Sequence, residues 1–158
     1  GDVMDQTDAK ILKILSENAN TTATEIGDTV GLSVPAVNKR ILKLQKDGTI
    51  KNFTIVTSAK KVNKPITAFI LLVMRYSEAI GTLLEYMEQD GDILECYAVT
   101  GEYDYLIKIC AEDVESLEEK LLKLKKHKGV VKSNTMFSLM EHKFKATMLP
   151  DADKMGDA

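Results

Sequence analysis

The sequence predicts an α+β protein in two parts: an N-terminal winged helix-turn-helix, then a C-terminal domain in the ferredoxin-like order βαββαβ. Two observations support this. Two short capped helices are joined by a glycine-containing turn within residues 22–48, and strand-like and helix-like segments alternate in that order from Ile66 onward. The 158 residues, 44% hydrophobic and 28% charged, suffice for one medium or two small globular domains.

The first helix is expected over residues 6–17. Asp5 and Asp8 lie where the positive end of the helix dipole favours carboxylates, and the apolar residues Ile11, Leu12, Ile14 and Leu15 would face inward. Such a helix is the third one that a two-helix motif needs to enclose a core.

The next two helices have local boundary signals. Thr22 and Glu25 have capping-box spacing, so a helix should begin near Ala23, and Gly31 supplies the left-handed residue that ends it. Ser33 is a natural N-cap for the following helix, whose first turn tolerates a proline. Gly48 closes that helix.

The second of these helices, residues 34–46, has one apolar and one basic face. Its predicted apolar stripe is Val34, Val37, Ile41 and Leu44. The opposite side carries Pro35, Lys39, Lys43 and Lys46, flanked by Ala36, Asn38 and Arg40. Solvated lysines also occur on ordinary surface helices, but a small-then-basic face after a capped turn favours insertion into a DNA major groove.

Charge is distributed unevenly along the chain. Residues 33–64 carry a net +7, whereas the remainder carries −10, for a total of −3. A basic segment in an acidic protein localises the phosphate-binding surface. We expect DNA contacts from Ser33 and Lys51 as well as from the helix residues Pro35, Ala36, Asn38, Lys39, Arg40 and Lys43.

The predicted domains are residues 4–50 for the helix-turn-helix, 51–65 for a wing and linker, 66–149 for the ferredoxin-like domain and 150–158 for a tail. Alternating apolar residues in 49–58 indicate a strand or small wing. The ferredoxin-like domain would contain strands in 66–75, 93–101, 104–112 and 130–149 and helices in 77–91 and 113–129. With both helices on one face of the sheet, the uncovered face would expose apolar side chains, so dimerisation through the sheets is expected.

This combination resembles the leucine-responsive regulatory protein/AsnC family of transcriptional regulators. The likeness runs from Met4 to about Leu149 and is carried by MDQTDAKILKIL, VGLSVPAVNKRILKLQKDGTIKNF and VTGEYDYLIKI. The resemblance implies a homodimer, often assembled further into tetramers or octamers. It also implies binding to a pseudo-palindromic operator in double-stranded DNA and a response to a small effector, commonly an amino acid. The family often has an arginine or another polar reader in the first half of the recognition helix, where this chain offers Pro35, Ala36, Asn38 and Lys39.

The resemblance also implies an effector site between subunits, near the loop Thr100, Gly101, Glu102, Tyr103 and Asp104, with Ser133 and Thr135 of the last strand as further candidates. Gly101 would allow backbone N–H groups to approach a carboxylate, and Asp104 would pair with an ammonium. An ordinary hairpin turn has the same composition, and without the resemblance that interpretation is favoured.

Two alternatives to an effector-responsive regulator remain open. Siroheme decarboxylases share this architecture, but they would need histidines near the hairpin, and this chain has only His127 and His142, neither in that loop. An architectural DNA-binding protein without an effector would show the same helix and oligomer. No catalytic constellation, metal cluster or cofactor motif is recognised, so no cofactor and no enzymatic activity are expected.

The remaining features are consistent with a cytoplasmic protein. Cys96 and Cys110 lack metal-ligand spacing, and no apolar run approaches bilayer length, so no membrane partner is expected. The residues before Met4 (Gly1, Asp2 and Val3) are expected to be an expression remnant.

Overall fold

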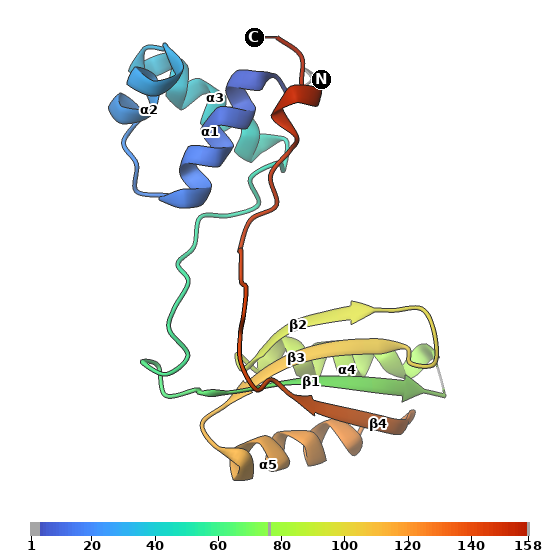
Figure 1. Cartoon of the computed structure of the whole chain (residues 1–158). Coiled ribbons are helices and arrows are strands. Elements are labelled where there is room, and N and C mark those ends of the chain that lie inside the picture. Colours follow the sequence, from blue (N-terminus) through green and yellow to red (C-terminus); the bar gives the residue numbers. More distant parts are fainter. Residues whose placement is uncertain (1–3, 76, 158) are drawn as a thin grey trace. The chain divides into compact units, whose positions relative to one another are not determined.

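The computed structural model describes residues 4–75 and 77–157, which divide into two compact units. The first unit contains the described residues up to Val56 and those from Lys143 onward; the second is Thr57–His142. Figure 1 labels the α-helices and strands of both units. The expectation about Gly1, Asp2 and Val3 lies outside the described residues.

The N-terminal part of the first unit contains the α-helices α1 (Gln6–Glu17), α2 (Ala23–Val30) and α3 (Val34–Lys46). Their N-cap side chains each accept a hydrogen bond from a backbone N–H of the first turn, as the sequence predicts for Thr22 and Ser33. Gly31 ends α2 with a φ of 75°. The helices enclose a core whose fully buried members are Ile11, Ile26 and Val37.

The C-terminal residues belong to this same unit, which the predicted boundaries did not anticipate. The short helix η2 (Ala152–Lys154) packs against α1, and the N–H of Gln6 donates to the carbonyl oxygen of Gly156 at 2.9 Å. Asp5 and Gly156 form a parallel β-bridge. Residues 150–157 are therefore a docked segment and not a tail, and residues 143–149 cluster with the first unit and not the second.

The prediction of a strand in residues 49–58 is wrong. Residues 51–58 have no ladder partner among the described residues, and Phe53, Ile55 and Val56 are exposed. Alternation of apolar and polar residues favours an extended backbone, but a strand also needs a hydrogen-bonded neighbour.

The second unit contains a four-stranded antiparallel sheet of order β2-β3-β1-β4, as the ferredoxin-like plan requires. Its strands are β1 (Ile66–Met74), β2 (Ile93–Ala98), β3 (Tyr105–Ala111) and β4 (Val130–Phe137). Its helices are η1 (Ser77–Ala79), α4 (Ile80–Gln89) and α5 (Val114–Lys125). Figure 1 shows α4 and α5 alongside the sheet.

One face of the sheet forms the core with both helices. Alternate residues of β1 and β3 are completely buried against Leu83 and Met87 of α4 and against Leu117 and Leu124 of α5. Leu84 of α4 and Val114 of α5 are exposed, because each helix meets the sheet along one narrow stripe.

The last strand is shorter than predicted. The final pairs with β1 join Ala68 to Phe137 and then the N–H of Ser138 to the carbonyl oxygen of Thr67, at 2.9 Å. Because β1 begins at Ile66, residues beyond 138 have no strand left to pair with.

Among the described residues, no helix is long and apolar enough to cross a bilayer.

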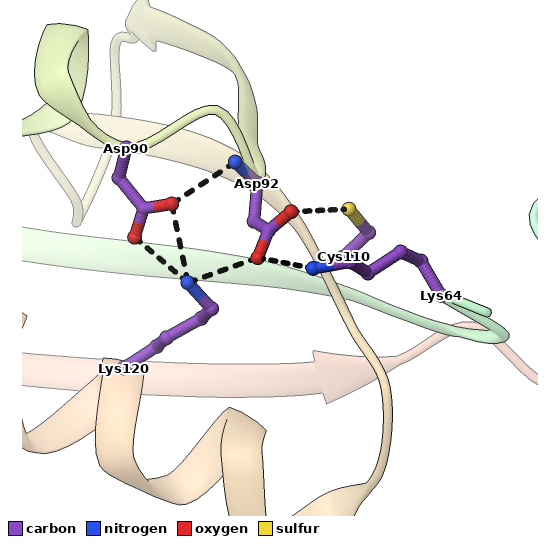
Figure 2. Close-up of polar contacts among 5 residues, drawn as sticks. All are labelled: Lys64, Asp90, Asp92, Cys110 and Lys120. Atoms are coloured by element: carbon purple, nitrogen blue, oxygen red, sulfur yellow. Dashed lines mark hydrogen bonds and ion pairs between the residues drawn. The ribbon is translucent and has the colours of Figure 1, made fainter. Parts of the chain in front are cut away.

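A polar cluster fastens the segment before β1 to the rest of the second unit (Figure 2). Nζ of Lys64 lies 2.8 Å from Asp92, and Nζ of Lys120 lies 2.9 Å from Asp90 and 3.1 Å from Asp92. The hydrogen bond from Lys64 lowers the pKa of the Asp92 carboxyl, against a smaller opposing effect of burial. The Cys110 thiol lies 3.8 Å from Asp92, and burial raises the pKa of that thiol.

Candidate DNA-binding and effector sites

The outer side of α3 is open, as predicted. Pro35, Asn38, Lys39 and Lys46 are exposed, whereas Ala36 and Lys43 are half-buried. The Ser33 side chain accepts a hydrogen bond from the N–H of Ala36 at 3.3 Å, so this exposed residue defines where the helix begins. Lys51 is exposed in the extended segment after the helix. A capped helix with amide and ammonium groups outward can enter a major groove.

Two apolar side chains also lie on the exposed part of α3. Val34 is 39% exposed and Leu42 is 51% exposed. The predicted apolar stripe is therefore wrong at its first residue, Val34. Of the four residues in that stripe, Val37 and Leu44 are the ones that are buried. The first turn of the helix extends past the core.

Arg40 is held within the first unit. Its Nη1 lies 2.7 Å from Oδ2 of Asp5 and 3.1 Å from Oδ1 of Asp8. Burial opposes ionisation of Asp5, but the hydrogen bonds from Arg40 and the Asp8 N–H outweigh it and lower the pKa of that carboxyl. The guanidinium is paired with two carboxylates and joins α3 to α1, so we do not assign it a phosphate contact.

Gly27 shapes the turn between α2 and α3, a role that sequence analysis missed. Its carbonyl oxygen accepts hydrogen bonds from the N–H groups of Gly31 and Leu32, at 2.8 and 3.0 Å. A Cβ atom at position 27 would lie 2.4 Å from the carbonyl oxygen of Leu32. The sequence does contain a signal for this role, because Gly27 lies inside a short helix, four residues before the Gly31 that ends it.

The predicted effector loop is anchored at the end of β1. The N–H of Asp104 donates to the carbonyl oxygen of Leu72, and the Asp104 carboxylate accepts from the N–H of Met74, both at 2.8 Å. Gly101 has a φ of 106° and open space around its α-carbon. Thr100, Glu102 and Asp104 are exposed. The loop can therefore present backbone N–H groups and a carboxylate to a ligand.

The structure brings Lys132 to this loop and separates it from two predicted residues. Nζ of Lys132 lies 5.3 Å from the centre of the Tyr103 ring. Ser133 and Thr135 pair with Leu72 and Ile70, whose side chains face the helices, so both lie on the opposite face of the sheet from Lys132. Lys132 was missed because its neighbour in space is distant in sequence.

The uncovered face of the sheet is largely apolar. It carries Phe69 and Leu71 of β1, Leu106 of β3 and Met136 of β4, which alternate with the core residues. None of these side chains is fully buried, and Met136 is exposed. The expectation that apolar side chains lie on the uncovered face is confirmed, and Lys108, the cross-strand partner of Phe69, lies among them.

Neither of two cavities in the second unit includes a predicted effector residue. One, of about 360 Å³, lies between α4 and β2 and is lined mainly by apolar residues with Glu88 and Glu95. The other, of about 210 Å³, is lined by Glu78, Thr82 and His127 among others. The His127 ring contacts the Tyr86 ring, with centroids 4.8 Å apart.

Comparison with known proteins agrees with both units. The family model described as "Lrp/AsnC ligand binding domain" matches residues 67–148, and "Winged helix-turn-helix DNA-binding" matches residues 4–51. The chain belongs to the Lrp/AsnC family. The resemblance found in the sequence is confirmed, and so is the combination of a winged helix-turn-helix with an α/β domain.

Individual Lrp/AsnC relatives match over most of the chain. The HTH-type transcriptional regulator FL11 of Pyrococcus furiosus is 34% identical, covering 94% of this chain and 97% of the relative. The transcriptional regulator AzlB of Bacillus subtilis is 36% identical, covering 73% and 75%. The transcriptional regulator NMB0573 of Neisseria meningitidis, solved as a complex with L-Met, has a TM-score of 0.87 and 30% identity, covering 92% and 96%.

Proposed function

We propose that this protein is a sequence-specific transcriptional regulator that binds operator DNA through α3 and responds to an amino acid through its second unit. The observation that carries the proposal is the exposed face of α3, where Asn38, Lys39 and Lys46 project from a capped helix-turn-helix. The matching relatives are named as transcriptional regulators, which supports this function over catalysis.

The DNA contacts divide into two groups by chemistry. Lys39, Lys43 and Lys51 provide ammonium groups for phosphates, which give affinity without sequence preference. Ser33, Pro35, Ala36 and Asn38 surround the first turn of α3, the part of a recognition helix that reaches base edges. Two such helices in a dimer would meet a pseudo-palindromic site, about 10 base pairs apart or a multiple of this.

The effector proposal rests on the loop of residues 100–104. Backbone N–H groups at Gly101 and the ammonium of Lys132 suit a carboxylate, while Asp104 suits an α-ammonium. The similar Neisseria regulator was solved with L-Met, an amino acid carrying both groups. Because the loop is exposed, we propose that a second copy of the chain completes the site.

Two measurements test the two halves of this proposal. Selection of bound duplexes from a random pool should enrich a pseudo-palindrome, and failure to enrich any sequence would overturn sequence-specific binding. Thermal melts with each common amino acid, L-Met included, should show a rise for at least one, since a ligand of the native state stabilises it by mass action. If no amino acid raised the melting temperature, the amino-acid response would be overturned, and an architectural DNA-binding protein would be the better description.

A further inference from the structure

The first turn of α3 presents an apolar surface to solvent at the place where a recognition helix meets base edges. Val34 is 39% exposed, whereas Val37, one turn later, is completely buried. Pro35 is also exposed and Ala36 is half-buried. The Ser33 cap fixes where the helix begins, so the direction of the Val34 side chain is set by the helix.

An exposed amide lies beside this apolar surface. Asn38 is four residues after Val34, so the two side chains are neighbours on one side of the helix. An asparagine amide can donate to and accept from the major-groove edge of adenine at the same time. Lys39, next in the chain, is exposed and provides charge complementary to phosphate.

Apolar side chains have one partner among base edges in the major groove. Thymine carries a C5 methyl group there, and the other bases present only hydrogen-bonding groups. We propose that Val34 contacts a thymine methyl group next to an adenine read by Asn38, so that the first half of α3 selects A·T pairs. This inference rests on the proposed DNA-binding function and adds the chemical group that the helix recognises.

Leu42 provides a matched control on the same helix. It is an exposed aliphatic residue like Val34, but it lies eight residues later, about 12 Å along the helix axis. Base contacts come from the N-terminal residues of a recognition helix. Leu42 should therefore not take part in reading thymine.

The test uses the full chain and duplexes selected from a random pool of about 20 base pairs, long enough for two half-sites. Each thymine of a selected duplex is replaced in turn by deoxyuridine, which lacks only the methyl group. At one thymine in each half-site this replacement should weaken binding about fourfold, the effect of one buried methyl-sized group. The Val34→Ser protein should bind the thymine duplex and the deoxyuridine duplex with equal affinity. The Leu42→Ser protein should still prefer the thymine duplex, like the unsubstituted protein.

The outcomes separate this inference from the proposed function. Enrichment of a sequence that then tolerates deoxyuridine at every position would overturn thymine reading and leave sequence-specific binding intact. Discrimination that persists in Val34→Ser would overturn the assignment to Val34. If Val34→Ser fails to fold, judged by its thermal melt, the deoxyuridine scan of the unsubstituted protein still decides whether a methyl group is read.

Discussion

Arg40 and Asp5 join two helices of the DNA-binding unit, with Nη1 of Arg40 2.7 Å from Oδ2 of Asp5. The same Asp5 side chain caps α1 by accepting from the N–H of Asp8 at 2.8 Å, and its backbone bridges to Gly156. One residue therefore connects the start of α1, the recognition helix and the C-terminal segment. A basic residue on a recognition helix need not be a DNA contact.

Arg40 and Lys39 should consequently respond differently to substitution. Lys39→Ala should reduce the slope of log K against log salt by about one for each bound copy of the chain, because each copy loses one phosphate contact. Arg40→Met should leave that slope unchanged but lower the free energy of unfolding by about 1–3 kcal/mol, because two carboxylates lose their partner. Filter binding at several salt concentrations and urea unfolding measure the two quantities. Lys10→Ala, an exposed lysine of α1, is the control, and a reduced slope in Arg40→Met would contradict its structural role.

Gly27→Ala should disrupt the turn before α3, because the new Cβ atom would lie 2.4 Å from the carbonyl oxygen of Leu32. We expect a loss of about 1–3 kcal/mol in the free energy of unfolding, as for overpacking in a core. Gly81→Ala is the matched control, since its helical position in α4 has nothing within 4 Å of the added atom. That change should stabilise by about 0.5–1 kcal/mol. Equal effects of the two substitutions in urea unfolding would refute the steric account.

Acid should weaken the second unit through Asp92. Its pKa is lowered in the folded state, first by the hydrogen bond from Lys64. A folded pKa below the unfolded value of about 3.9 contributes stability above that pH and loses it as the pH falls through the folded pKa. The amide protection factors of β1 and α5, which are exchange rates corrected for the intrinsic effect of pH, should therefore fall below about pH 4. Asp92→Asn should flatten this dependence, whereas Asp151→Asn, in an exposed ion pair, should not.

Asp104→Asn should abolish the thermal shift caused by an amino-acid effector and leave effector-free DNA binding intact. Asparagine keeps an oxygen that can accept from the Met74 N–H, so the loop stays anchored while the charge that would pair with an ammonium is removed. Glu118→Gln, which changes an exposed carboxylate of α5 outside the loop, should retain the response. A full response in Asp104→Asn would remove Asp104 from the site.

Leu71→Glu should convert the proposed dimer into monomers in sedimentation measurements. It places a charge opposite Leu106 on the uncovered face of the sheet, and burying that charge in a dimer would be costly. Val114→Glu, at an exposed position of α5, should not change the sedimentation coefficient. A Leu71→Glu protein that stays dimeric would show that the copies associate through another surface.

The helices of the first unit could be predicted because their boundary signals are local in sequence. Features that depend on residues far apart in the sequence could not be predicted. Thr22 and Ser33 marked their helices because capping involves residues three positions apart. The role of Arg40 depends on Asp5, 35 residues away, which no local pattern indicates. The end of β4 depends on where β1 begins, and residues 130–149, which mix apolar and polar side chains throughout, contain no signal for it.

The pairing of Gln6 with Gly156 makes the second unit an insertion within the first, with two covalent connections between them. A protease that cuts after Val56 would therefore not by itself release the DNA-binding helices, because the segment that begins at Lys143 stays attached to the sheet domain while its residues 152–156 are docked at α1. Complete separation would require a second cut or the undocking of that segment.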